Sequence, residues 1–206
     1  MKTRILKTTS PEAIPAALDI QLRGGLIAFP TDTVYGLGTS AFNSSAVEKI
    51  YTAKGRPFEK AIPVLIGNQE DLIQLTSSMP EMANRLIHKF WPGPLTIIVF
   101  KKSTVPGSVS STSTIAIRMP DHLFTLELLN QTGPLAVTSA NLSNQPDPTT
   151  AEQVLEQLDG RIDLLLDGGE TPRGYPSTLV DCTGSLPILL RAGPISEMEI
   201  LSTASD

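Results

Sequence analysis

Short apolar segments alternate with helix-like segments along almost the whole chain. The apolar segments have the length of buried strands, and they cover residues 26–30, 62–66, 95–100, 115–118, 135–138, 162–166, 179–181 and 188–191. Strands that alternate with helices are typical of α/β folds, in which helices cover a sheet. The pattern therefore predicts an α/β chain with about seven strands in one large, twisted, mixed sheet.

Capping signals predict about five helices between these strands. The helices are expected to begin at Ser10–Pro11, at a capping box of Ser45 and Glu48, at Met79, at Asp121, and at Thr150 with Gln153 three residues later. Glycine or proline ends most of them, at Gly24, Pro57, Pro92 and Gly133. The chain contains no internal repeat, and we expect residues 1–206 to form a single domain.

Charge and cysteine content exclude several classes of protein. The net charge is −5 and there is one cysteine, Cys182, so neither an internal disulfide nor a cysteine-based zinc site can form. A protein that mainly binds nucleic-acid backbone usually carries a basic surplus, which is absent here. No apolar run approaches the roughly 20 residues that span a bilayer. We therefore expect a soluble, cytoplasmic protein that does not bind membranes.

The signatures of hydrolases, metal sites and common nucleotide folds are missing. The sequence has no G-x-S-x-G, no G-x-x-x-x-G-K-[ST] and no G-x-G-x-x-G. Its two histidines, His88 and His122, have no spaced metal-ligand partners. We therefore predict no metal site made by the protein itself.

Five polar loops that follow or precede the predicted strands are the candidates for a site. The first, PTDTVYGLG (30–38), places three hydroxyls and a carboxylate directly after a buried strand. The third, TSANLS (138–143), also follows a strand, where a polar ligand is often bound. The fourth and fifth are YPST (175–178) and LRAG (190–193). Taken alone, each is equally compatible with an ordinary Gly, Asx or Ser turn.

The second loop holds a cluster of cations, Lys54, Arg56 and Lys60, around KGRP (54–57). Cations at the end of a helix often only offset its dipole. Here Gly55 and Pro57 constrain the backbone, so that the three cations could converge on a phosphate or carboxylate. Spacing alone does not decide between the two interpretations. A Ser- and Thr-rich segment, residues 103–114, is either a mobile loop or a hairpin, and we expect it to fold over whatever Arg118 binds.

Six motifs together resemble the YrdC/TsaC family of threonylcarbamoyl-AMP synthases. They are PTDTVYGLG (30–38), KGRP (54–57), WPGPLT (91–96), TSANLS (138–143), PSTLVD (176–181) and LLRAG (189–193), and they occur in the family's order and spacing. The resemblance covers about residues 25–193. It implies a YrdC-like α/β domain with a twisted sheet around a deep, basic cavity.

The resemblance also implies a reaction. The family combines ATP, L-threonine and bicarbonate or carbon dioxide, and releases pyrophosphate and threonylcarbamoyl-AMP. A downstream threonylcarbamoyl-transferase complex then modifies tRNA. ATP would be a substrate, and Mg²⁺ would accompany it by bridging phosphate oxygens. No protein nucleophile is needed, because catalysis consists of alignment and neutralisation of anions.

The same resemblance assigns roles to individual residues. Lys54 and Arg56 would be catalytic, and the ATP site would consist of Lys54, Arg56, Lys60, Ser139, Asn141 and Arg191. The threonine site would consist of Thr33, Arg118, Thr138 and Ser177, with Arg118 on the carboxylate. Asp32 stands where many relatives carry Glu, so the resemblance assigns it no role. Lys54 and Arg56 lie at a helix end and in a loop, and we expect their substitution to change the melting temperature little.

The main alternative is a YrdC-like module that binds double-stranded RNA or tRNA without synthase activity. The negative net charge argues against it, but a local basic face would still allow weak RNA binding. A paralogue without activity would be expected to lose the Lys54–Arg56 or Ser139–Asn141 pair, and both pairs are present. A domain of a larger carbamoyl-transfer protein is a third alternative, disfavoured by the absence of flanking zinc-finger cysteines.

Overall fold

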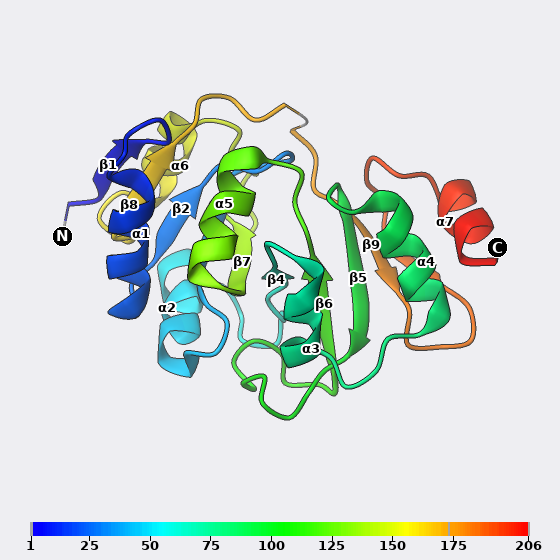
Figure 1. The fold of residues 1–206 in the computed structure, drawn as a ribbon. Coiled ribbons are helices and arrows are strands. Elements are labelled where there is room, and N and C mark those ends of the chain that lie inside the picture. The colour runs from blue at the N-terminus through cyan, green and yellow to red at the C-terminus, as the bar shows by residue number, and fades with distance from the viewer. Residues whose placement is uncertain (1, 173, 206) are drawn as a thin grey trace.

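A ten-stranded mixed sheet forms the centre of the computed structural model, which describes residues 2–172 and 174–205 (Figure 1). The strand order is β1-β8-β2-β3-β7-β4-β6-β5-β9-β10. Their bounds are β1 Arg4–Lys7, β2 Ile27–Phe29, β3 Gly36–Ser40, β4 Val64–Leu65, β5 Leu95–Phe100, β6 Thr114–Arg118, β7 Leu135–Ser139, β8 Leu164–Asp167, β9 Thr178–Asp181 and β10 Ile188–Arg191. Parallel pairs (β1–β8, β2–β8, β4–β6 and β5–β9) occur beside antiparallel ones. The predicted mixed α/β sheet is confirmed.

Seven α-helices and one 3₁₀-helix, η1 Gln69–Asp71, lie around this sheet in the described residues. They are α1 Ala13–Leu22, α2 Ser44–Lys54, α3 Leu72–Leu75, α4 Glu81–Phe90, α5 Leu123–Thr132, α6 Ala151–Leu158 and α7 Glu197–Ser205. In Figure 1, α1 and α5 lie side by side over one part of the sheet, and α4 and α7 lie together at its other end. No described helix is long and apolar enough to cross a membrane.

Two hydrophobic clusters explain how the helices cover the sheet. Along β2, Ile27 and Phe29 belong to a cluster with α1 and α5, whereas Ala28 belongs to a larger cluster with α2 and α6. Because neighbouring strand residues point to opposite faces, this half of the sheet is covered on both sides. The larger cluster continues into β5 and β9, beneath α4 and α7.

Several helix starts differ from the predicted ones. Asn43, not Ser45, caps α2, because its side chain accepts a hydrogen bond from Ala46 N at 3.1 Å. His122, not Asp121, caps α5. Helix α1 begins at Ala13, three residues after Ser10. The predicted cap Thr150 of α6 is confirmed.

The glycines of the first polar loop lie in a strand rather than in a turn. Gly36 and Gly38 are part of β3, which pairs with β2 and β7. A Cβ atom at Gly36 would lie 2.7 Å from Val137, and one at Gly38 would lie 2.9 Å from the same side chain. The glycines therefore allow β3 to pack closely against Val137. Spacing of glycines alone does not distinguish this role from a turn.

Candidate functional site

Lys54 is a buried cation that is fixed by backbone carbonyls. It is the last residue of α2, and the left-handed Gly55 (φ 60°) caps this helix. The Lys54 residue is only 2% exposed, and its Nζ donates to Ser139 O, to Asn141 O and, at 3.1 Å, to Asn141 Oδ1. In return, Ser143 N donates to Lys54 O at 2.8 Å. We call Lys54, Ser139 and Asn141 the Lys54 cluster.

Burial, together with the nearby positive charge of Arg56, lowers the pKa of Lys54 to about 7. The Arg56 guanidinium is half-exposed and turned toward its own loop, where it donates to Lys60 O at 3.2 Å and to Ala61 O at 2.9 Å. The Lys60 side chain is exposed. The three predicted cations therefore differ in burial, and Lys54 is part of the folded core rather than a surface side chain.

Arg118 is a second buried cation, and its charge is balanced by a carboxylate. It ends β6 and is 6% exposed, and its Nη2 forms an ion pair with Asp32 Oδ1, which is itself buried. Its Nη1 donates to Thr33 Oγ1 at 2.9 Å, and its Nε donates to Gly93 O at 3.0 Å. We call Asp32, Thr33 and Arg118 the Arg118 cluster. Sequence analysis assigned no role to Asp32, although the motif that carries it was recognised.

Ser177 and Arg191 belong to a third group, the Ser177 cluster, with Thr96. The hydroxyls of Ser177 and Thr96 are 2.6 Å apart, and both residues are buried. Arg191 Nε donates to Ser177 O at 3.0 Å, and its Nη2 donates to Ser177 Oγ at 3.1 Å. Thr96 was not among the predicted site residues. Its position in WPGPLT, as the second residue of β5, was the signal that could have identified it.

Short connections join the three clusters. The loop that contains Gly93 contacts both the Arg118 and the Ser177 cluster, because Pro94 O accepts from Thr178 N at 2.9 Å. Strand pairing places Gly36, just after the Arg118 cluster's loop, opposite Ser139 of the Lys54 cluster. Thr138 is half-buried on the same strand, one residue before Ser139. Polar loops that are far apart in the sequence thus form one connected network.

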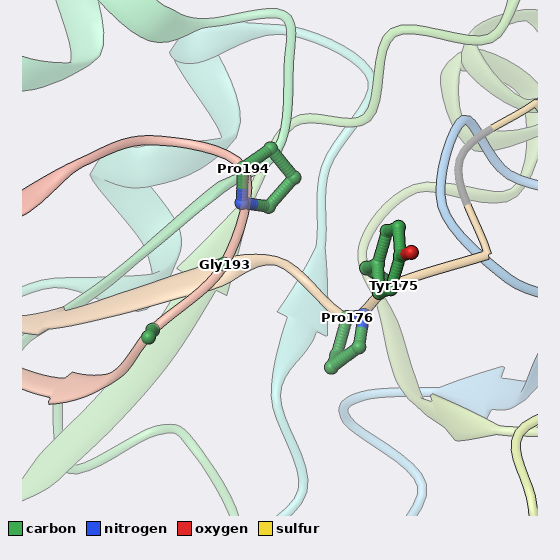
Figure 2. Close-up of a pocket in the computed structure, with 5 residues that line it drawn as sticks. Tyr175, Pro176, Gly193 and Pro194 are labelled. Carbon is green, nitrogen blue, oxygen red and sulfur yellow. The ribbon is translucent and has the colours of Figure 1, made fainter.

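A pocket of about 620 Å³ lies beside the Ser177 cluster. Figure 2 shows Tyr175 and Pro176 on one side of it and Gly193 and Pro194 on the other. A Cβ atom at Gly193 would lie 2.3 Å from Thr178 N, so only glycine allows the two segments to approach this closely. All five lining residues, which include Ala192, are uncharged. This pocket is therefore not the deep basic cavity that the resemblance implies.

The segment of residues 103–114 lies away from Arg118, contrary to prediction. It precedes β6, whereas Arg118 ends this strand. Val105 and Val109 are buried in the core, and Tyr51 Oη donates to Ser108 O at 2.9 Å. The segment forms the loop that joins the antiparallel strands β5 and β6, and it lies at the end of β6 opposite Arg118.

Among the described residues near these clusters there is neither a reactive thiol nor a metal-binding set. Burial raises the pKa of the Cys182 thiol to about 12, so the thiolate is disfavoured. His122 is used to cap α5. Within residues 2–172 and 174–205, no three His, Cys, Asp or Glu side chains are grouped closely enough to hold a metal ion. The network instead offers cations, hydroxyls and amides, which suits the binding and alignment of anions.

Comparisons with known proteins agree on one family. The Sua5/YciO/YrdC family, described as "Telomere recombination", matches residues 19–193. Threonylcarbamoyl-AMP synthase of Bacillus subtilis is 45% identical over 198 residues, which is 95% of this chain and 57% of that protein. Threonylcarbamoyl-AMP synthase of Pseudomonas aeruginosa is 35% identical over 159 residues, which is 77% of this chain and 86% of that protein.

A solved structure shares the fold over nearly the whole chain. The crystal structure of Pyrococcus abyssi Sua5 complexed with L-threonine superimposes with a TM-score of 0.92 at 40% identity. It covers 98% of this chain, but this chain covers only 61% of the Pyrococcus protein. The chain therefore spans about three-fifths of the length of the Bacillus and Pyrococcus relatives.

Proposed function

Because this chain belongs to the Sua5/YciO/YrdC family, we propose that it makes threonylcarbamoyl-AMP from ATP, L-threonine and bicarbonate or carbon dioxide. The observation that carries the proposal is the single network that contains two buried cations, Lys54 and Arg118. The relatives support it in two ways. One relative has L-threonine bound, and the Pseudomonas synthase is little longer than the region that it shares with this chain.

The amino-acid substrate is best placed at the Arg118 cluster, with Thr138 and Ser177 nearby. An arginine guanidinium pairs well with a carboxylate, and the Thr33 hydroxyl beside it can accept or donate a hydrogen bond. The threonine hydroxyl would be read by a polar group such as Thr138 or Ser177. The threonine amine would add to carbon dioxide with loss of a proton, which forms a carbamate.

The nucleotide is best placed between the Lys54 cluster and the pocket beside Ser177. Lys54, Arg56 and Lys60 would face the phosphates, and Ser139, Asn141 and Arg191 would orient the nucleotide. The carbamate oxygen would attack the α-phosphorus of ATP, and pyrophosphate would leave. Lys54 and Arg56 would be catalytic by stabilising the negative charge that develops on the phosphates.

Magnesium would enter with ATP. The network supplies no cluster of carboxylates, and Mg²⁺ in nucleotide sites keeps several waters and is held largely by phosphate oxygens. Bound in this way, the ion would neutralise phosphate charge and favour departure of pyrophosphate. The side chains of this chain would then only need to orient the nucleotide.

We propose that residues 1–206 form a single domain, which acts in the cytoplasm and passes its product to a separate threonylcarbamoyl-transferase complex that acts on tRNA. Direct RNA binding is testable by salt dependence. Several phosphate contacts would give a steep loss of affinity as salt rises, and a flat response would exclude a backbone-binding RNA site.

The synthase proposal is tested by incubating the protein with ATP, threonine and labelled bicarbonate. We expect ATP-dependent release of pyrophosphate together with a labelled adenylate, and neither product when threonine is omitted. Pyrophosphate without labelled adenylate, or no turnover at all, would overturn the proposal.

A further inference from the structure

Tyr35 connects four segments of the site, although sequence analysis gave it no role. The residue is fully buried, between the Arg118 cluster's loop and strand β3. Its backbone N donates to Pro148 O at 2.9 Å, and its backbone O accepts from Ala140 N at 2.8 Å. Ala140 lies between Ser139 and Asn141 of the Lys54 cluster, so the Tyr35 backbone connects this cluster to the Arg118 cluster's loop.

The Tyr35 side chain reaches a different segment. Its hydroxyl donates to Gly169 O at 2.7 Å and accepts from Gly168 N at 3.1 Å. The hydroxyl is therefore both a donor and an acceptor to the same turn. Burial raises the pKa of Tyr35 to about 12, so the hydroxyl keeps its proton at neutral pH. Gly168 and Gly169 are themselves exposed on the surface.

The turn held by Tyr35 begins the segment that forms one wall of the pocket. This segment continues to Tyr175 and Pro176, and its residue 173 lies outside the described residues. Along its length, Thr171 N donates to Thr149 O at 2.9 Å and Gly174 N donates to Thr33 O at 3.0 Å. The Tyr35 hydroxyl thus holds the start of the pocket wall together with Asp167, whose Oδ1 accepts from Gly169 N at 2.9 Å, and backbone contacts continue along the segment.

We propose that Tyr35 is a positioning residue for the nucleotide: its hydroxyl holds the Gly168–Gly169 turn, and thereby the pocket wall of Tyr175 and Pro176. The proposal rests on the proposed function in assigning this pocket to the nucleotide. Ser177, at the end of the segment, is held separately by Thr96 and Arg191. Loss of the Tyr35 hydroxyl should therefore affect ATP and leave threonine almost unaffected.

Tyr35→Phe is the direct test, because phenylalanine keeps the buried ring and removes only the hydroxyl. A hydrogen bond of this kind contributes a factor of about two to ten to an equilibrium. We expect the KM for ATP to rise about fivefold while the KM for threonine and kcat change less than about twofold. Hydrogen exchange of the Gly168 and Gly174 amides should accelerate by a similar factor. A purely structural tyrosine would alter both KM values together or neither.

A glycine pair gives a matched second test. Gly169 (φ 82°) and Gly133 (φ 71°) both have left-handed backbones with open space where a Cβ would lie. Alanine at either position strains the backbone, because both residues have a positive φ. Gly133 ends α5, away from the pocket. We expect Gly169→Ala to raise the KM for ATP and Gly133→Ala to leave it unchanged, although both substitutions lower the melting temperature.

The results separate this proposal from the synthase proposal. If the wild-type protein makes no threonylcarbamoyl-AMP, the synthase proposal fails, and calorimetric titration with ATP together with hydrogen exchange still decides the role of Tyr35. Unchanged exchange at Gly168 and Gly174 in Tyr35→Phe, or equal ATP affinity of the two glycine variants, would overturn it.

Discussion

Two buried cations, Lys54 and Arg118, are stabilised in this molecule by different means. The Lys54 ammonium is surrounded by the carbonyls of Ser139 and Asn141 and forms no ion pair within the described residues. The Arg118 guanidinium has a buried carboxylate, Asp32, as its partner. Carbonyl dipoles solvate a cation without cancelling its charge, whereas a carboxylate makes the pair neutral as a whole.

Because of this difference, the two regions suit different ligands. The Lys54 cluster, with Arg56 beside it, retains net positive charge and suits a polyanion such as a triphosphate. The Arg118 cluster pairs its cation with a carboxylate and suits a zwitterion, which has a carboxylate and an ammonium group of its own. This difference in charge agrees with the proposed placement of ATP and threonine. Substitutions around either cation test it.

The largest effect is expected for Asp32→Asn. Removal of one partner of a buried ion pair typically costs about 3–5 kcal/mol, because the remaining charge loses its counter-charge. The free energy of unfolding from urea titrations should fall by this amount. The exposed pair of Arg23 and Asp19 provides the control, because Asp19→Asn should cost less than about 1 kcal/mol. If the two substitutions cost the same, Asp32 is not the compensating charge and the comparison fails.

The next largest effect is a difference in stability between substitutions of Lys54 and of Arg56. Lys54→Met and Arg56→Ala should each lower synthase turnover about a hundredfold, as loss of one charge-stabilising group often does. Only Lys54→Met should also lower the free energy of unfolding, by about 2 kcal/mol, since it leaves buried carbonyls without a donor. Within residues 2–172 and 174–205, the hydrogen bonds of the Arg56 side chain go to carbonyls of its own loop. For Lys54 this prediction differs from the sequence-based expectation that both variants keep their melting temperature, and equal melting temperatures would support that expectation instead.

Much of the fold could be predicted from local patterns, and the misses have physical causes. The apolar strands of the sheet's centre and the Thr150 cap were predictable because burial and capping leave local signals. Strand β1 was missed because three of its four residues are exposed, so no buried pattern marks it. Strand β3 was missed because its glycines are typical of turns, and only the close approach of Val137 explains them.

The site was predictable as a set of motifs but not as a set of contacts. The order of the motifs indicated which loops form the candidate site, and in the structure these loops are joined in one network. Burial of Lys54 and its bonds to Ser139 and Asn141 depend on residues about 85 positions apart, which no local pattern reveals. The pairing of Asp32 with Arg118 has the same cause. The segment 103–114 was misplaced because sequence order does not reveal that it lies at the opposite end of β6 from Arg118.

The smallest effect is a pH dependence that only the Lys54 cluster should show. Burial lowers the pKa of folded Lys54 from 10.5 to about 7. Between these values the unfolded chain binds more protons than the folded one, so the free energy of unfolding should rise with pH. Relative to Lys54→Met, the wild type should gain about 1 kcal/mol per pH unit between pH 7.5 and 9, below the limit of about 1.4 for one group. Relative to Arg118→Met, no such change is expected, because arginine stays protonated throughout this range. Urea titrations of the three proteins at four pH values measure both differences. If the difference in free energy of unfolding between the wild type and Lys54→Met did not change with pH, the surrounding carbonyls would keep the ammonium charged. The two cations would then differ only in their partners.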